Sequence, residues 1–153
     1  ELIIDETEAE IHAENLPAIE GIPRQMSQLF ANLISNSLKY RLEDTAPLIT
    51  ITSELLSSEA AADYNLDEYT DYYRIEFTDN GIGFNQEYAD KIFNIFQRLD
   101  GKSEYSGTGI GLSICKKIVQ NHHGHIEASS AKGSGAKFIV ILPAVQHSDN
   151  EVR

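Results

Sequence analysis

The feature that most constrains this chain is the fixed order of one amide-bearing helix and three glycine clusters. Asn32 and Asn36 lie one helical turn apart in an apolar pattern that predicts a helix from Pro23 to about Leu42. The glycine clusters follow at residues 79–83, 107–111 and 133–135. Glycine permits positive φ and close approach of a ligand to the backbone, so each cluster is either a plain turn or part of a binding site.

Predicted strands and helices alternate along the chain. The expected strands are 48–52, 73–78, 125–129 and 137–142, with a short strand and turn at 16–21 and an edge strand at the end of 1–13. Further helices are expected at 89–99 and after the second glycine cluster, where Gly124 ends the helix. This order predicts an α+β fold of two layers: one mixed, mostly antiparallel sheet with helices on one face.

Residues 54–72 carry six acidic side chains and no basic one. We expect a long, solvated hairpin connection there, with a partner-binding loop as the alternative.

Composition narrows the class of protein. A chain of 153 residues with 41% hydrophobic and 24% charged residues fits one globular domain. The net charge of −12 disfavours nucleic acid and anionic membrane as partners, since both select basic surfaces. No apolar run approaches the ~20 residues that span a bilayer. The single cysteine, Cys115, excludes an internal disulfide, fits a reducing compartment such as the cytoplasm, and is expected in the core.

The helix from Pro23 carries a polar stripe beside its apolar side, made up of Gln25, Gln28, Asn32, Asn36 and Lys39. Solvated helix faces are usually rich in Glu and Lys, whereas most of these positions are amides. An amide carbonyl is a neutral oxygen ligand for Mg²⁺, which also takes phosphate oxygens and water. Local hydrogen bonding of the amides is the alternative explanation.

The glycine clusters differ in their context. Asp79 follows a predicted strand directly and could accept a hydrogen bond from an amino group such as that of adenine. Residues 107–111 open a helix, where free N–H groups and the helix dipole favour phosphate. No Gly-Lys-Ser/Thr follows, so this is not a P-loop, and the spacing does not fit a dinucleotide fingerprint. The cluster at 133–135 would by itself be a hairpin turn.

Together these motifs resemble the catalytic and ATP-binding domain of sensor histidine kinases, within the Bergerat-fold superfamily of gyrase, chaperone, histidine-kinase and mismatch-repair ATPases. The matching boxes are 32–40 (N box), 79–84 (first glycine box), 92–98 (F box), 107–112 and 133–138 (later glycine boxes). The resemblance covers about residues 15–143, and the stretch 96–119 looks most like the phytochrome-type branch.

The resemblance implies a role for each matched residue. Asn36 would ligate Mg²⁺ on the triphosphate and Asn32 would support it. Lys39 would contact phosphate, Tyr40 would line the ribose or base region, and Asp79 would bind the adenine amino group.

It also implies roles for the glycines and for two cations. Gly81 and Gly83 would let the base come close, while a mobile lid and phosphate cradle would be formed by Gly107, Thr108, Gly109, Ile110, Gly111 and Leu112. Arg98 and Lys102 would reach the γ-phosphate, with a solvated loop position as the alternative for Lys102. Phe93 and Phe96 would pack at the base of the lid or in the core. Ala136 stands where the family often has Ser or Thr, so a hydroxyl near the adenine is absent.

Hydrolytic relatives place a glutamate one turn before the metal asparagine to activate water. Asn32 occupies that position here and cannot take a proton at neutral pH, which favours transfer to a protein acceptor over hydrolysis. No histidine of the chain has the flanking residues of a phosphoacceptor, so we expect the acceptor on an upstream dimerisation domain. A serine kinase of the anti-sigma type and a degenerate nucleotide-binding interaction module remain alternatives on the same fold.

The expected organisation is a linker remnant at 1–14, the ATP-binding domain at 15–143 and a tail at 144–153. The isolated domain is expected to be a monomer, the full-length protein a homodimer, and a response-regulator receiver domain an indirect partner. No direct contact with a membrane or nucleic acid is expected.

Overall fold

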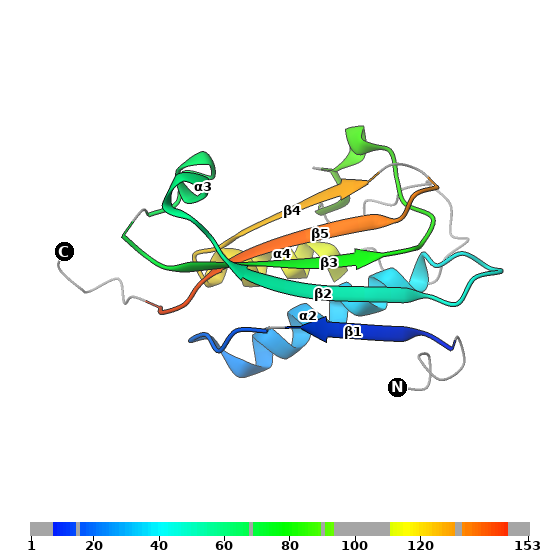
Figure 1. The fold of residues 1–153 in the computed structure, drawn as a ribbon, viewed down its shortest axis with the longest axis horizontal. Coiled ribbons are helices and arrows are strands. Elements are labelled where there is room, and N and C mark those ends of the chain that lie inside the picture. The colour runs from blue at the N-terminus through cyan, green and yellow to red at the C-terminus, as the bar shows by residue number, and fades with distance from the viewer. Residues whose placement is uncertain are drawn as a thin grey trace.

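The computed structural model describes residues 8–14, 16–67, 69–89, 91–93, 111–130 and 133–146. They form a five-stranded sheet of order β1-β2-β3-β5-β4 with helices α2 and α4 against one face (Figure 1). The strands are β1 (Glu10–Glu14), β2 (Leu48–Leu55), β3 (Tyr72–Asp79), β4 (His125–Ser130) and β5 (Ala136–Pro143). The helices are α2 (Pro23–Lys39), α3 (Ser58–Asp63) and α4 (Gly111–Asn121), with 3-10 turns η1 (Gln86–Tyr88) and η2 (Lys91–Phe93).

The pairing of the strands confirms the expected fold class. β1 runs parallel to β2 at one edge, and every other described pair is antiparallel. The sheet is therefore mixed and mostly antiparallel, and the two long helices make the second layer.

Helix α2 begins at Pro23, where the missing N–H of proline costs nothing, and turns its apolar side to the sheet. Leu29 and Leu33 are completely buried there. The ring of Phe30 meets Phe77 of β3 edge to face, with 5.0 Å between the ring centroids. A fully buried leucine stabilises a fold by roughly 1.5–3 kcal/mol, so the burial of Leu29 and Leu33 holds α2 against the sheet.

Alternation along β3 assigns its two faces. Ile75 and Phe77 lie in the core under the helices, while Arg74 and Glu76, which alternate with them, point to the opposite face. Cys115 of α4 is also part of this core and fully buried, as the sequence predicts.

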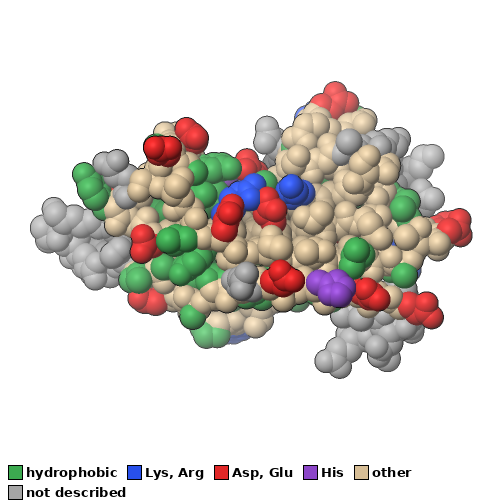
Figure 2. Space-filling model, viewed as in Figure 1, with side chains coloured by type: hydrophobic (Ala, Val, Ile, Leu, Met, Phe, Trp, Pro, Cys, Tyr) green, Lys and Arg blue, Asp and Glu red, His purple; other side chains and the backbone are tan. Residues whose placement is uncertain are grey.

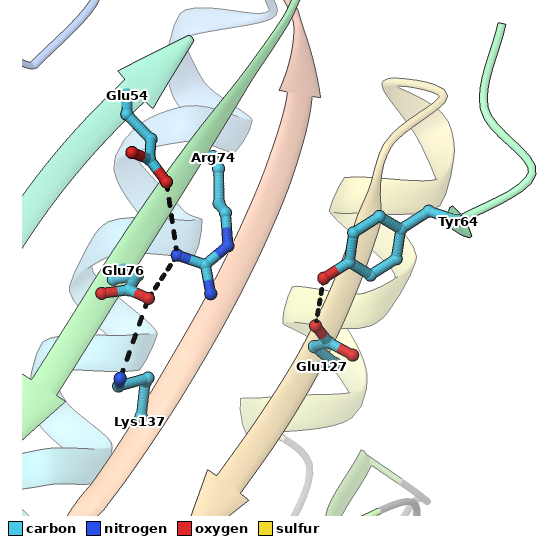
Figure 3. A network of polar contacts seen from close by, with 6 residues as sticks. All are labelled: Glu54, Tyr64, Arg74, Glu76, Glu127 and Lys137. Carbon is cyan, nitrogen blue, oxygen red and sulfur yellow. Dashed lines mark hydrogen bonds and ion pairs between the residues drawn. The ribbon is translucent and has the colours of Figure 1, made fainter. Parts of the chain in front are cut away.

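The opposite face of the sheet carries a chain of ionic contacts (Figure 3). Glu76 pairs with Arg74 and with Lys137, whose Nζ lies 3.8 Å from a Glu76 oxygen. Arg74 also lies 3.7 Å from Glu54. Figure 2 looks onto this face and shows the basic side chains near its centre with acidic ones beside them. Burial lowers the pKa of Arg74, but the hydrogen bond to Glu76 and its charge outweigh that effect and the pKa is raised.

One end of the same face is covered by the connection between β2 and β3. Tyr64 follows α3 and donates a 2.9 Å hydrogen bond to Glu127 of β4. A second apolar cluster lies beside it, formed by Tyr72, Ile139 and Ile141 with Leu56, Tyr64 and Leu66. Burial, followed by the hydrogen bond and charge of Glu127, raises the pKa of Tyr64. The expected hairpin connection at 54–72 does join two antiparallel strands, β2 and β3, but it also contains a capped helix and packs on the sheet.

Two other expectations need correction. Residues 16–21 form no strand, because Glu20 makes a single backbone bond, from its N–H to Ala144 O at 2.9 Å, rather than a ladder. One or two short helices are expected at 89–99, but its described residues, 89 and 91–93, contain the 3-10 turn η2 and no α-helix, and residues 90 and 94–99 lie outside the described residues.

Candidate nucleotide site

The carboxylate of Asp79, at the end of β3, is held by three donors from three other parts of the chain. Its Oδ1 accepts hydrogen bonds from the N–H of Gly81 at 2.9 Å and of Ala136 at 3.1 Å. Its Oδ2 accepts a 2.8 Å bond from the hydroxyl of Ser37, a residue of α2 that is only 4% exposed. The carboxylate orientation is thus fixed before any ligand arrives, and Oδ2 keeps acceptor capacity for one more donor.

Two glycines allow the backbone to close around this carboxylate. A Cβ on Gly81 would lie 2.6 Å from the carbonyl oxygen of Tyr40, which accepts a bond from the N–H of Ile82. Gly135 has φ +80°, and a Cβ there would lie 2.1 Å from the carbonyl oxygen of Asp79. Both glycines are required by close backbone approach, so the cluster at 133–135 is more than a hairpin turn.

A hollow that opens to solvent lies beside Asp79. Its lining residues are Asn36, Tyr40, Asp79, Gly83, Phe84, Ile92, Leu112, Ala136 and Phe138. The wall is mostly apolar, and the polar side chains on it are the amide of Asn36, the phenol of Tyr40 and the carboxylate of Asp79. This hollow, which we call the apolar slot, has a few convergent polar groups. It therefore suits a flat heteroaromatic ring that carries an amino group.

The aromatic part of the wall is anchored in the core. Phe93 of η2 is buried and packs edge to face on Phe138 of β5, at 6.2 Å between ring centroids. On the other side, the N–H of Phe84 donates a 2.9 Å bond to the hydroxyl of Ser130. These two contacts attach Phe93 to β5 and Phe84 to β4.

Helices α2 and α4 pack against each other and contribute Asn36 and Leu112 to the wall of the hollow. The amide of Asn32 donates to the carbonyl oxygen of Gly111, the first residue of α4, at 3.5 Å, which is a weak bond. Further along, the Cys115 thiol lies 3.9 Å from the carbonyl oxygen of Leu29. Burial raises the pKa of Cys115 to about 12, against a smaller lowering by Asn32, so the thiol stays protonated and unreactive.

The residues at the hollow can be tested for a fit to Mg²⁺. Asn36 offers a neutral oxygen, and the part of the chain that is described contains no group of three or more His, Cys, Asp or Glu that could hold a metal ion. This donor set fits Mg²⁺ only when phosphate oxygens and water supply the remaining ligands, which is its usual mode in nucleotide sites.

The structure places the sequence-predicted residues in three groups. Asn36, Tyr40, Asp79, Gly83 and Leu112 line the hollow. Gly81, Asn32, Lys39 and Gly111 do not line it: Gly81 and Asn32 make the contacts given above, and the Lys39 ammonium lies 5.7 Å from the centre of the Tyr40 ring. The predicted residues Phe96, Arg98, Lys102, Gly107, Thr108, Gly109 and Ile110 lie outside the described residues.

Sequence reasoning missed Ser37 as the partner of Asp79, and Phe84, Ile92 and Phe138 as walls. The one available signal for Ser37 was its position directly after Asn36, inside the N box. Ala136 was noted only for its missing hydroxyl, yet its backbone N–H is one of the donors to Asp79.

The chain is similar to known proteins in both sequence and fold. A family profile described as "Histidine kinase-, DNA gyrase B-, and HSP90-like ATPase" matches residues 21–146. The chain is 42% identical over 140 residues to cyanobacterial phytochrome A of Nostoc sp. (92% of this chain, 16% of that protein). It is 33% identical over 133 residues to sensor protein kinase WalK of Staphylococcus haemolyticus (84% of this chain, 19% of that protein).

A solved structure of the catalytic domain of histidine kinase ThkA superposes with a TM-score of 0.66 at 27% identity, covering 93% of this chain and 84% of that one. The chain spans less than a fifth of the length of cyanobacterial phytochrome A and of sensor protein kinase WalK. No helix among the described residues is long and apolar enough to cross a bilayer.

Proposed function

Because this chain belongs to the family of histidine kinase-, DNA gyrase B- and HSP90-like ATPases, as a histidine-kinase ATP-binding domain, we propose that it binds ATP with Mg²⁺ and donates the γ-phosphate to a histidine on another domain. The observation that carries the proposal is the pre-oriented Asp79 carboxylate at one end of an apolar slot that also contains Asn36. An acceptor-only group in that position favours adenine, whose amino group donates, over a base that presents a carbonyl oxygen there.

The proposed site divides the nucleotide between two regions. The base enters the apolar slot beside Gly83, Phe84 and Phe138, with its amino group toward Asp79 Oδ2. The triphosphate extends along α2 toward Asn36 and the first turn of α4, where backbone N–H groups favour phosphate. Bound Mg²⁺ would neutralise phosphate charge there and offset the net charge of −12.

Phosphoryl transfer requires positioning and charge stabilisation more than covalent chemistry. Asn36 would hold the metal ion, and Lys39, Arg98 and Lys102 are proposed to contact phosphate oxygens. Asn32 cannot act as a base toward water and is already engaged with Gly111. This absence of a base beside Asn36 supports transfer to a protein acceptor over hydrolysis.

The acceptor is proposed to be a histidine on a helical dimerisation domain, with a receiver domain as the next recipient. The reported relatives are a phytochrome and a sensor kinase, which favours histidine over the serine acceptor of an anti-sigma kinase. We further propose a cytoplasmic site of action, where ATP is available and a lone thiol such as Cys115 stays reduced.

Calorimetry with ADP or a non-hydrolysable ATP analogue, with Mg²⁺ and with chelator, tests the binding step. We expect Mg²⁺-dependent binding of the triphosphate analogue, and Asn36→Ala should lose that dependence while still binding adenosine. The absence of binding at millimolar nucleotide would contradict the proposal and favour a degenerate interaction module.

The transfer step is tested by mixing the chain and labelled ATP with a histidine-bearing helical hairpin or with a serine-bearing antagonist protein. We expect an acid-labile phosphoryl group on the hairpin, since phosphohistidine hydrolyses in acid. An acid-stable product on the serine protein would instead identify a serine kinase.

A further inference from the structure

His122, directly after α4, is 2% exposed, and both of its ring nitrogens are used. Its Nδ1 lies 2.8 Å from the carbonyl oxygen of Ile118, and its Nε2 lies 3.0 Å from the backbone nitrogen of Ile22. A carbonyl oxygen only accepts and a backbone N–H only donates, so Nδ1 carries the proton and Nε2 accepts. The imidazole is therefore a neutral bridge with a defined tautomer.

This bridge joins segments that are distant in the sequence. Ile22 is the N-cap residue of α2, and no side chain caps that end of the helix. It also ends the segment 16–22, which we call the lead-in segment because it connects β1 with α2. The carbonyl oxygen of His122 in turn accepts a 2.9 Å bond from the side chain of Gln146. Packing is close here, since a Cβ on Gly21 would lie 3.4 Å from His122 Nε2.

Helices α2 and α4 are thus connected at three levels. Asn32 contacts Gly111 beside the nucleotide site, Cys115 contacts Leu29 in the middle, and His122 contacts Ile22 at the far end. The first contact is long at 3.5 Å and the second involves a weak sulfur donor, whereas the His122 bond has the ordinary length of 3.0 Å and its acceptor ring is buried. Of these three contacts, the far-end bond, between the residue after α4 and the N-cap residue of α2, has the best hydrogen-bond geometry.

We propose that His122 is a positioning residue for nucleotide binding: by fixing the C-terminal end of α4 to the start of α2, it sets where the first turn of α4 lies relative to Asn36. The same bond attaches the lead-in segment to the end of α4. A displacement of that segment would therefore move α4 and change the geometry of the nucleotide site. This inference rests on the proposed function, because it assumes that nucleotide occupies the hollow that Asn36 of α2 and Leu112 of α4 help to line.

Two measurements on the unmodified chain test the bridge. Two-bond ¹H–¹⁵N NMR correlations should show His122 protonated at Nδ1, and a proton at Nε2 would overturn the assignment. Hydrogen exchange of the Ile22 amide should slow at least threefold on addition of saturating ADP and Mg²⁺, since coupling between two sites is reciprocal. The Leu56 amide, bonded to Tyr72 O in the β2–β3 connection, is the control and should not change.

The variant His122→Gln, checked to be folded at the working temperature, should bind ADP about fivefold more weakly, the loss expected for one buried hydrogen bond. The Ile22 amide of this variant should exchange fast, and its exchange rate should not change when ADP is added. The matched control is His123→Asn, at an exposed neighbour with φ +61° that asparagine tolerates, and it should bind ADP as the unmodified chain does.

The outcomes separate this inference from the proposed function. Equal ADP affinity in folded His122→Gln and in the unmodified chain, or an Ile22 amide that does not respond to bound ADP, would overturn the positioning role alone. An unmodified chain that binds no nucleotide would overturn the proposed function. Should the glutamine variant fail to fold, the tautomer and the Ile22 exchange still decide the matter.

Discussion

Replacing Asp79 with asparagine should strongly weaken adenine binding and leave the fold in place. The two backbone donors, Gly81 N–H and Ala136 N–H, both point at Oδ1, so the asparagine oxygen must take that position. Its NH₂ group then occupies the place of Oδ2, where the Ser37 hydroxyl can reverse and accept from it. Every internal partner stays satisfied, but the group that faces the ligand has changed from acceptor to donor.

The expected loss of binding free energy follows from this change of the ligand-facing group from acceptor to donor. A hydrogen bond to a charged acceptor contributes about 1.5–3 kcal/mol, and two opposed donors leave a further unsatisfied group. We therefore expect a loss of at least about 3 kcal/mol, or about a hundredfold in Kd for ADP. The unfolding free energy should change by only about 1 kcal/mol, which shifts Tm by about 2–4 °C in a chain of this size.

Calorimetric titration of ADP into both proteins measures this loss, and thermal unfolding checks the fold. Inosine diphosphate is the matched ligand control, since it presents a carbonyl oxygen where adenine has its amino group. The preference for ADP over inosine diphosphate should be large in the unmodified chain and should disappear or reverse in Asp79→Asn. An ADP affinity within threefold of the unmodified chain would refute the assignment of Asp79 to the base.

Three further perturbations have expected outcomes that depend on the same geometry. Ser37→Ala removes the buried donor to Asp79 and should lower the unfolding free energy by about 1–2 kcal/mol in chemical denaturation, and an unchanged midpoint would contradict that bond. Gly135→Ala should cost more than about 2 kcal/mol, because a Cβ at φ +80° also meets the Asp79 carbonyl oxygen at 2.1 Å. Gly133→Ala is its control, since φ there is +87° but nothing lies within 4 Å of the added Cβ, and only the strain of about 1 kcal/mol should remain. The Cys115 pKa is raised from 9.0 to about 12 in the folded state, so the unfolded chain loses this proton first and the stability contributed by the neutral thiol falls as pH rises from 9 to 12. Unfolding free energies at pH 8 and pH 10 should therefore diverge more in the unmodified chain than in Cys115→Ala, and equal differences would refute the burial of the thiol.

The motif residues of the site could be predicted because their spacing reflects local structure. The spacing of Asn32 and Asn36 follows from helical geometry, and the placement of Asp79 follows from the end of an alternating strand. The two-layer fold could be predicted in the same way, from segments whose period of two or 3.6 residues is clear.

The remaining contacts depend on distant pairing that no local pattern reveals. Ser37 and Asp79 are 42 positions apart, and His122 and Ile22 are 100 positions apart. The helix α3 was missed because six residues are too few for a periodic pattern, although the side chain of Ser57 caps it by accepting from Ala60 N–H. The strand expected at 16–21 failed because apolar composition cannot show whether a neighbouring strand is available to pair with it.

The Asp79 carboxylate belongs to β3, and its three donors come from α2, the turn after β3 and β5. The carboxylate therefore acquires its orientation only when these segments, from Ser37 to Ala136, have packed together. Assembly of the binding site and completion of folding are therefore one event. Nucleotide should bind the native state and ignore the unfolded chain, and a ligand at a hundred times its Kd would add about 2.7 kcal/mol to stability. Cellular ATP would then stabilise the folded domain in addition to serving as its substrate.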